Sequence, residues 1–558
     1  MKLLFLFAAI VCLTANLNIV NAQLNPPKSE LFPLSIIHIN DFHARYEPTD
    51  TAGGACESPN ECIGGYARTV YTVRQLLEQQ KENNVVYFNA GDSFQGTLWY
   101  NVGRWNVTSQ FLNLLPADAM TLGNHEFDHG VEGVVPFLDA LDSPMLVANI
   151  DARNEPTMEG KYQPSMIIER SGRKIGVIGV ILETTYDLSN TGKLIFRNES
   201  ETILEEAAKL KAQGANIIIV LSHCGYDVDK LIAEKAGSEI DVIVGSHSHT
   251  FLYTGDTPPG PDVPKGDYPT IVRHSPTGHR VLIVQAGAYA KYVGNLTIYF
   301  DNDGNVVDYE GAPLYMGSDV PQAQDVIDTM EPWKLLLDEQ ISQIIGETKV
   351  DLLKDNCDRT ECNIGNFFAD AAVYAFTKLT PYDNVYWSQA SIALINTGAI
   401  RVPLTRGNLS YGHLSTMSPF ENKMTAFSLP GLELLNALEF SLNEIDMDVG
   451  KTTSSIFLQV SGLKITYNIT QPLGRRVQNV KVLCQNCEVP TYLPLDVEET
   501  YRIITSDFIA EGGGGFTMFR DHGQDLQKEM TDLEAVCDYV KDNTPIITGL
   551  DKRITILY

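Results

Sequence analysis

The chain has 558 residues, 44% of them hydrophobic, and at roughly 100–200 residues per domain this length predicts two or three domains. Its 70 acidic and 41 basic residues give a formal net charge of −29, which excludes the basic footprint that binding to a nucleic acid backbone requires. An acidic chain can still bind phosphate where metal ions and a few arginines make one site positive.

The N-terminus has the pattern of a secretory signal peptide. Lys2 supplies the positive charge, residues 3–17 are apolar, and Val20-Asn21-Ala22 forms a small-residue cleavage site. We therefore expect residues 1–22 to be removed and the mature chain to begin at Gln23. An uncleaved anchor is the alternative, but the apolar run is short for a membrane span.

Residues 23–318 alternate short apolar runs with helical patterns, which is typical of an α/β sheet with crossover helices. We expect strands at residues 35–39, 85–89, 119–122, 174–181, 215–221, 241–244 and 281–285, and helices at 66–83 and 201–213. Residues 254–269 are rich in Pro, Gly and Asp and are predicted to form a surface loop.

The pattern changes after residue 315. Residues 322–345 form a long amphipathic stretch, so we place a linker helix at residues 319–345. A second α/β domain is expected at residues 346–558. No other apolar run is long enough to span a bilayer, and residues 551–558 lack the tail of a lipid-anchor signal, so we expect no membrane anchor.

Cysteines and glycosylation motifs agree with export. Sequons begin at Asn106, Asn198, Asn295, Asn408 and Asn468. The close pairs Cys56/Cys62, Cys357/Cys362 and Cys484/Cys487 predict small disulfide-bonded loops. Zinc sites are the alternative, but no pair has a second Cys/His pair nearby to complete four ligands. Cys224 and Cys537 are expected to be free thiols.

Metal-ligand residues follow five of the expected strands. They are Asp41 with His43, Asp92, Asn124 with His125, His223, and His247 with His249. Ligands of open α/β sheets bind at the carboxyl ends of the strands. A single such residue is most often a cap or a loop residue. Five in succession, mixing His with Asp or Asn, favour one shared site.

The chemistry of these ligands predicts two adjacent ions. Mixed imidazole and carboxylate ligands suit zinc, manganese or iron. The eight candidate groups are too many for one tetrahedral ion, whereas two ions bridged by Asp92 would use them. Two ions bind and acidify a water and hold a phosphate for in-line displacement. We expect two divalent ions, with zinc favoured and manganese, calcium or magnesium as alternatives.

These residues lie in four motifs: NDFHAR at residues 40–45, AGDSFQGT at 90–97, GNHEFD at 123–128 and GSHSHT at 245–250. Together with His223, the motifs resemble the signatures of the 5′-nucleotidase/apyrase family, over nearly the whole mature chain. GTLWYN at residues 96–101, followed by Arg104-Trp105, is most similar to the secreted salivary apyrases of blood-feeding insects. The resemblance implies a four-layer metallophosphatase sandwich, joined by a helix to a C-terminal α/β nucleotide-binding domain.

The resemblance also implies roles for individual residues. One ion would be held by Asp41, His43, Asp92 and His249, and the other by Asp92, Asn124, His223 and His247. His249 departs from the Asn or Gln common in vertebrate and bacterial relatives. Asp128 would orient His125, which would stabilise the phosphoryl oxygens or the leaving group; a structural histidine is the alternative. Arg45 would contact phosphate or form a surface salt bridge.

The C-terminal domain would hold the nucleotide. By resemblance, Asn396, Gly398 and Arg401 line the site, and Phe420 and Phe508 sandwich the base. Stacking between aromatic rings would accept any nucleobase. Two positions depart from the family pattern. Asp358 stands where the family has Arg, so Arg359 is the substitute candidate. Gly514 stands where relatives often carry an Asp that binds the ribose.

We therefore expect a secreted apyrase that converts ATP and ADP to AMP and suppresses platelet aggregation from saliva. A 5′-nucleotidase that converts AMP to adenosine is the first alternative. A non-catalytic protein that binds a platelet receptor or nucleotides is the alternative from another class. Retired enzymes lose ligands, whereas every metal position here carries a competent group. The expected partners are extracellular nucleotides, not nucleic acid or membrane.

Overall fold

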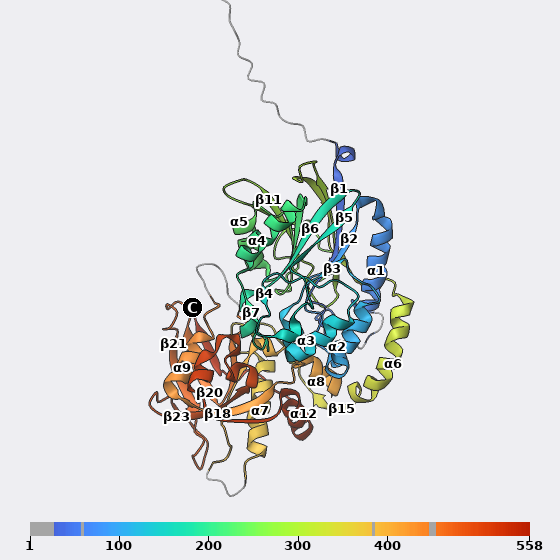
Figure 1. Ribbon diagram of the computed structural model, residues 1–558. Coiled ribbons are helices and arrows are strands. Elements are labelled where there is room, and N and C mark those ends of the chain that lie inside the picture. Colours follow the sequence, from blue (N-terminus) through green and yellow to red (C-terminus); the bar gives the residue numbers. More distant parts are fainter. Residues whose placement is uncertain (1–26, 57, 59–60, 382–385, 446–453) are drawn as a thin grey trace, which may run out of the picture.

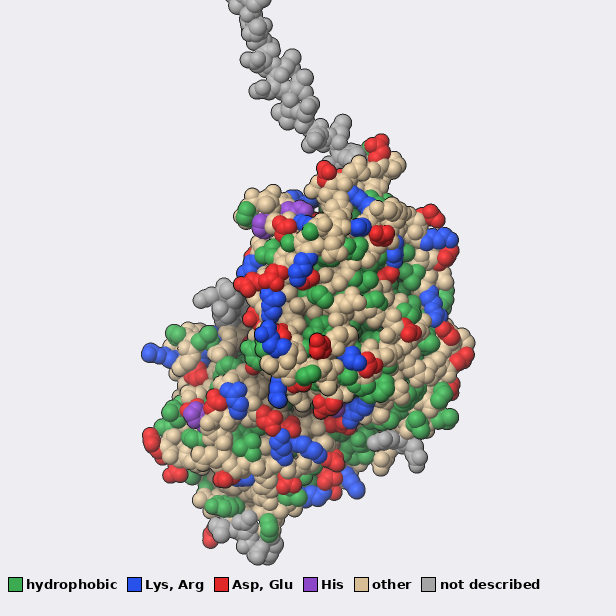
Figure 2. All heavy atoms as spheres, viewed as in Figure 1, with side chains coloured by type: hydrophobic (Ala, Val, Ile, Leu, Met, Phe, Trp, Pro, Cys, Tyr) green, Lys and Arg blue, Asp and Glu red, His purple; other side chains and the backbone are tan. Residues whose placement is uncertain are grey.

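The computed structural model describes residues 27–558 except 57, 59–60, 382–385 and 446–453. The signal peptide expected at residues 1–22 lies outside the described residues. Within them, no helix combines the length and the hydropathy that a bilayer span requires. The N-terminal and C-terminal halves form two lobes (Figure 1), and acidic and basic side chains are interspersed over the face shown in Figure 2.

Two six-stranded sheets form the N-terminal lobe. One has the order β13-β12-β1-β2-β3, with β14 also paired to β12, and the other has the order β10-β11-β9-β8-β6-β5. The first sheet comprises β1 (Phe32–Ile39), β2 (Val86–Asn89), β3 (Ala119–Met120), β12 (Tyr292–Phe300), β13 (Val306–Gly311) and β14 (Leu314–Tyr315). The second comprises β5 (Ser165–Arg170), β6 (Arg173–Ile181), β8 (Ile217–His223), β9 (Val242–Val244), β10 (Thr270–Arg273) and β11 (Arg280–Val284). The short strands β4 (Ile150–Asp151) and β7 (Ile195–Phe196) pair separately.

The sheets pack face to face through a fully buried apolar layer that includes Leu34, Phe88, Val177, Ile219 and Leu296. On the outside of the first sheet lie α1 (Tyr66–Gln79), α2 (Leu98–Leu112) and α3 (Gly130–Ala140). On the outside of the second lie α4 (Glu199–Ala212) and α5 (Tyr226–Ala236). The resulting helix–sheet–sheet–helix order confirms the expected four-layer sandwich.

The observed elements agree with most of the expected ones. All seven expected strands are present with shifted ends, and residues 254–269 contain neither helix nor strand, as predicted. The expected helix at 66–83 ends at Gln79 and is followed by a separate 3-10 turn, Lys81–Asn83. The expectation missed β5, β10, β12 and β13, which pair antiparallel to their neighbours. Such strands mix apolar and polar residues and lack the continuous apolar runs of buried parallel strands.

The linker helix expected within residues 319–345 is α6, which spans Gln324–Ile341. Residues 344 and 345 belong instead to β15 (Ile344–Thr348), so the helix end in that expectation was wrong. The apolar pattern continues through both elements, but β15 pairs with β17 (Gly407–Ser410), and this tertiary pairing overrides the local helical periodicity.

A five-stranded sheet with the order β19-β16-β23-β18-β24 forms the centre of the C-terminal lobe. One face is covered by α7 (Asn363–Lys378), α8 (Tyr411–Met417) and α12 (Asp532–Asn543). The other is covered by α9 (Gly431–Phe440), α11 (Thr517–His522) and a four-stranded sheet, β22-β21-β20-β25. The remaining elements are β16 (Ile392–Asn396), β18 (Lys423–Pro430), β19 (Leu458–Ser461), β20 (Leu463–Asn468), β21 (Val477–Leu483), β22 (Tyr492–Pro494), β23 (Thr500–Ser506), α10 (Asp507–Ala510), β24 (Gln524–Thr531) and β25 (Ile554–Leu557). This arrangement confirms a second α/β domain.

Helix α2 of the first domain contacts the segment that precedes β18 in the second. The amide of Asn101 donates to the backbone oxygen of Pro419 at 3.0 Å, and Arg104 forms a 2.7 Å ion pair with Glu421. The residue between Pro419 and Glu421 is Phe420. The interface therefore fixes this aromatic side chain at the boundary of the two domains.

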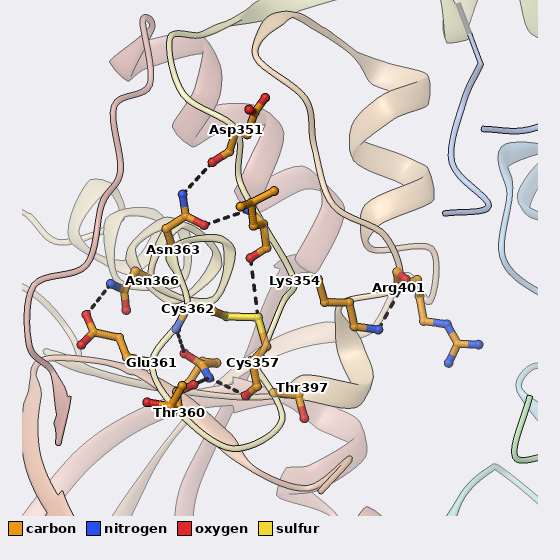
Figure 3. The surroundings of a disulfide bond; sticks show 12 residues. Asp351, Lys354, Cys357, Thr360, Glu361, Cys362, Asn363, Asn366, Thr397 and Arg401 are labelled. Atoms are coloured by element: carbon orange, nitrogen blue, oxygen red, sulfur yellow. Dashed lines mark hydrogen bonds between the residues drawn. A yellow bond between two sulfur atoms is a disulfide. The ribbon is translucent and has the colours of Figure 1, made fainter. Parts of the chain in front are cut away.

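Three disulfides join the expected cysteine pairs, and Cys224 and Cys537 are free, as predicted. Figure 3 shows the loop closed by Cys357 and Cys362, which the buried Gln459 anchors. The side-chain nitrogen of Gln459 donates to the backbone oxygens of Cys357 and Thr360, both at 2.7 Å. The side-chain oxygen of Gln459 accepts from the backbone nitrogen of Cys362 at 3.1 Å. These bonds tie the loop to β19 of the C-terminal sheet.

The anchoring role of Gln459 predicts that Gln459→Leu lowers the free energy of unfolding by about 2–5 kcal/mol, because three backbone groups of the loop lose their partner. The measurement is thermal unfolding of the purified protein. Gln478→Leu, at an exposed position, is the matched control. Equal unfolding midpoints for the two variants would contradict the role of Gln459.

Candidate metal centre and active site

The expected ligand residues meet at one edge of the two sheets. Asp41 and His43 follow β1, Asp92 follows β2, and His223 is the last residue of β8. His247 and His249 follow β9, and Asn124 begins the 3-10 turn after β3. These strands run parallel within their sheets, so their carboxyl ends converge.

The side chains form two groups that share one carboxylate. Asp41, His43, Asp92 and His249 each bring a ligand atom within 4.8 Å of the others, and Asp92, His223 and His247 form a second such group. Asn124 adjoins the second group, since its Oδ1 lies 2.9 Å from Nδ1 of His247. The cluster is compatible with a dinuclear metal site whose two groups of candidate ligands share Asp92.

The orientation of the imidazole rings fits bound cations. Nε2 of His43 and Nε2 of His249 face each other at 2.9 Å. Nδ1 of His223 lies 2.8 Å from the backbone oxygen of Ala90, which directs Nε2 to Asp92 Oδ2 at 3.1 Å. Apart from this contact with Asp92, the buried Nε2 has no hydrogen-bond partner among the described residues. A backbone bond at one ring nitrogen that aims the other at a cluster is typical of metal-binding histidines.

Burial and local charge set the protonation of the ligands. Burial lowers the pKa of His43 and His249 well below the usual value and that of His247 to about 3, which favours the neutral form that binds metal. Burial alone would raise the pKa of Asp92, but His223 and neighbouring imidazoles hold it well below its usual range. Burial lowers the pKa of His223, but Asp92 outweighs it and raises that pKa to about 9, so a cation at this pair replaces a proton.

His125 and Asp128 lie beside the cluster as a hydrogen-bonded pair. His125 Nδ1 is 2.7 Å from Asp128 Oδ2, whose other oxygen accepts from Ser189 Oγ at 3.1 Å. Burial by itself lowers the pKa of His125, but Asp128 and Asp92 outweigh this effect and raise it above its ordinary value. The charged form of His125 can donate a proton toward a bound oxyanion.

Sequence reasoning missed Glu126, which positions the metal loops. Its buried carboxylate accepts four backbone N–H groups: those of Asp92 (3.0 Å) and Gly123 (2.6 Å) at Oε2, and those of Ser93 (2.7 Å) and Phe94 (3.1 Å) at Oε1. One side chain thus ties the loop after β2 to the loop after β3. The position of Glu126 inside the GNHEFD motif was the one sequence signal for this role. The motif alone does not distinguish a buried, loop-bonding carboxylate from an exposed one.

Two substrate candidates reach the cluster from the C-terminal domain. Arg401 follows the 3-10 turn Thr397–Ala399, and its charge lowers the pKa of His43 and His249 beyond the larger effect of burial. The ring of Phe420 stacks on His125, with centroids 5.7 Å apart and an interplanar angle of 22°. The Arg401 guanidinium lies 5.4 Å from the centroid of the same Phe420 ring. The two domains therefore meet at the metal cluster.

The other substrate candidates lie farther out. Asn396 ends β16, the backbone nitrogen of Gly398 donates to Ser455 at 2.9 Å, and Phe508 is half-buried against Gly513. Arg359 is exposed and bonds Asn356 of its own loop at 2.9 Å, so the structure does not bring it to the cluster.

Arg45 is buried beneath the cluster. Only 1% of it is exposed, and its Nη1 donates to the backbone oxygen of His43 at 2.7 Å. A surface salt bridge, one of the two roles considered for this residue, is therefore excluded.

The role of Glu126 predicts that Glu126→Gln lowers activity or metal affinity about 10- to 100-fold, because an amide nitrogen faces N–H groups where a carboxylate accepted them. Metal content and phosphate release would be measured on the same folded preparation. Glu132→Gln, at an exposed position of α3, serves as the control. Unchanged activity in Glu126→Gln would refute the positioning role.

Two family models match the chain: "Calcineurin-like phosphoesterase" over residues 34–251 and "5′-nucleotidase, C-terminal domain" over residues 344–521. A "5′-nucleotidase-related protein" of Glossina morsitans morsitans is 48% identical over 535 residues, covering 95% of each chain. An "Apyrase" of Tabanus yao is 47% identical over 527 residues, covering 94% of each chain.

A solved structure shares the fold. The 5′-nucleotidase precursor of Thermus thermophilus has a TM-score of 0.84 and 34% identity, covering 94% of this chain and 99% of that one. With the cluster at the sheet edge and the second domain facing it, these similarities show that the chain belongs to the 5′-nucleotidase family and is a metal-dependent nucleotide phosphohydrolase.

Proposed function

We propose that the chain is a secreted apyrase that removes the terminal phosphate of ATP and ADP and stops at AMP. The observation that carries the proposal is the convergence of Arg401 and Phe420 on the metal cluster from the other domain. The relatives named "Apyrase" in Tabanus yao and Aedes aegypti, 47% and 39% identical, support this substrate class. Three disulfides fit an oxidising, extracellular setting.

In this proposal Asp41, His43, Asp92 and His249 hold one divalent ion, and Asp92, Asn124, His223 and His247 hold the other. When bound, the ions supply an acidified water for in-line attack and positive charge for the terminal phosphate. His125, charged by Asp128, donates a hydrogen bond to the phosphoryl oxygen on which negative charge develops. Arg401 offers a planar fork to phosphate oxygens.

The nucleoside end of the substrate falls to the C-terminal domain. Phe420 and Phe508 would stack on the two faces of the base, and Asn396 and Gly398 would border it. Stacking accepts every base, and Gly514 offers no carboxylate to the ribose, so broad nucleoside specificity follows. In saliva, removal of ADP would suppress platelet aggregation in the host.

Phosphate release from ATP, ADP and AMP, each assayed separately with a chelator control, tests the proposal. We expect release from ATP and ADP, loss of that release with chelator, and little release from AMP. Release mainly from AMP would make the protein a 5′-nucleotidase with the same centre. Release from none of the three, with zinc, manganese, calcium or magnesium added, would favour a binding protein.

The role given to His125 predicts that His125→Asn lowers kcat by about 10²- to 10⁴-fold while metal content stays unchanged, because the residue acts on the substrate without holding an ion. The exposed His522→Asn serves as the control. Loss of metal together with activity would show instead that His125 is a ligand or supports one.

A further inference from the structure

Three cationic side chains lie near the domain boundary and form no ion pair with a described residue, although Asp358 and Asp50 are close enough to act on Lys354 and Arg45. In the described part of the chain, the Arg401 guanidinium makes no hydrogen bond or ion pair, and the Lys354 ammonium bonds only the backbone oxygen of Arg401, at 3.4 Å. Nη2 of Arg45 is buried and likewise has no partner among the described residues. In a chain with 70 acidic and 41 basic residues, such a group of unpaired cations indicates an anion site.

Lys354 precedes the disulfide-bonded loop described above, and its ammonium contacts the backbone oxygen of Arg401. In Figure 3 both extend from the disulfide side of the C-terminal domain, and the Arg401 guanidinium points to the blue ribbon of the N-terminal domain. Lys354 lies three positions before Cys357, so the disulfide and Gln459 restrain the segment that carries it. Burial, with the charge of Arg401, lowers the pKa of Lys354, and a bound anion would oppose both effects.

Tyr289 faces these cations from the N-terminal domain. Its ring lies against the metal-ligand residues His249 and His43, at centroid distances of 5.2 and 5.6 Å, and Arg45 lies 4.2 Å from its ring centroid. Its hydroxyl makes no hydrogen bond to any residue that the structure describes. The Tyr289 hydroxyl and the Arg45 guanidinium are therefore placed directly beside the metal cluster, where a ligand can meet them.

We infer that Lys354, Arg401 and the Tyr289 hydroxyl bind the phosphate next to the one that is cleaved. This inference rests on the proposed function, since it assigns the metal cluster to the terminal phosphate. The next phosphate of ADP or ATP then lies outside the cluster, toward the cations around Tyr289. AMP has no such phosphate, so Lys354 is a specificity-determining residue for nucleoside di- and triphosphates.

Arg359 is exposed and bonds Asn356 of its own loop. Lys354, three positions before Cys357, bonds no side chain among the described residues and is therefore the better placed of the two cations. A lysine contacts phosphate as a compact point charge. Such a charge can bind the α-phosphate of ADP or the β-phosphate of ATP, whichever lies next to the phosphate that is cleaved.

The test compares Lys354→Met and Lys354→Arg with wild type, using ADP, ATP and p-nitrophenyl phosphate, which carries a single phosphate. We expect Lys354→Met to lower kcat/KM for ADP and ATP about 10- to 100-fold, the value of a lost charged hydrogen bond, and to leave the single-phosphate substrate unchanged. Lys354→Arg should restore much of the loss. Competition by inorganic pyrophosphate should weaken in Lys354→Met, whereas competition by orthophosphate should not.

Lys349→Met, at an exposed position of the same segment, is the matched control and should behave as wild type. Equal losses for ADP and p-nitrophenyl phosphate, or no loss for either, would overturn the assignment of Lys354. The activity of the wild type on ATP, ADP and AMP tests the proposed function separately. A wild type that cleaves only AMP would contradict the apyrase proposal. The role of Lys354 is tested by the ratio of the variant's kcat/KM to that of the wild type on each substrate.

Discussion

The active site depends on one buried carboxylate, that of Asp92. It belongs to both groups of metal-ligand side chains, and burial alone would neutralise it. Imidazoles keep it charged, and the four hydrogen bonds that Glu126 accepts hold its loop in place. A buried charge needs such surroundings, because desolvation without partners costs several kcal/mol (about 2–7 kcal/mol even for an unpaired neutral polar group). The convergence of parallel strand ends at one sheet edge supplies them.

In the proposed mechanism, the two domains divide the chemistry between them. The N-terminal sandwich supplies the metal-ligand candidates, His125 and Tyr289, and the C-terminal domain would contribute Arg401, Lys354 and Phe420. Contacts of Asn101 and Arg104 with residues 419 and 421 hold the two parts in register. On this proposal, reaction and recognition meet at the domain boundary, where small changes in side chains would alter substrate choice without altering the metal cluster.

Local signals in the sequence predicted the parallel strands and the ligand cluster, whereas the four-layer sandwich was predicted from the family resemblance. Continuous apolar runs mark β6 and β8, and His or Asp directly after a strand marks the binding edge. Glu126 and Lys354 left no comparable signal, since each acts through contacts with residues distant in sequence or in the other domain. The end of the linker helix was misplaced for the same reason, because the pairing of β15 with β17 is a tertiary interaction.

The metal content of the purified protein, compared between wild type and Asp92→Asn, shows whether two ions share this carboxylate. We expect two divalent ions per wild-type chain and loss of bound metal and of activity together in Asp92→Asn, with the fold retained by circular dichroism. A wild-type chain that binds a single ion, or an Asp92→Asn variant that keeps both ions and full activity, would contradict a shared carboxylate at a two-ion centre.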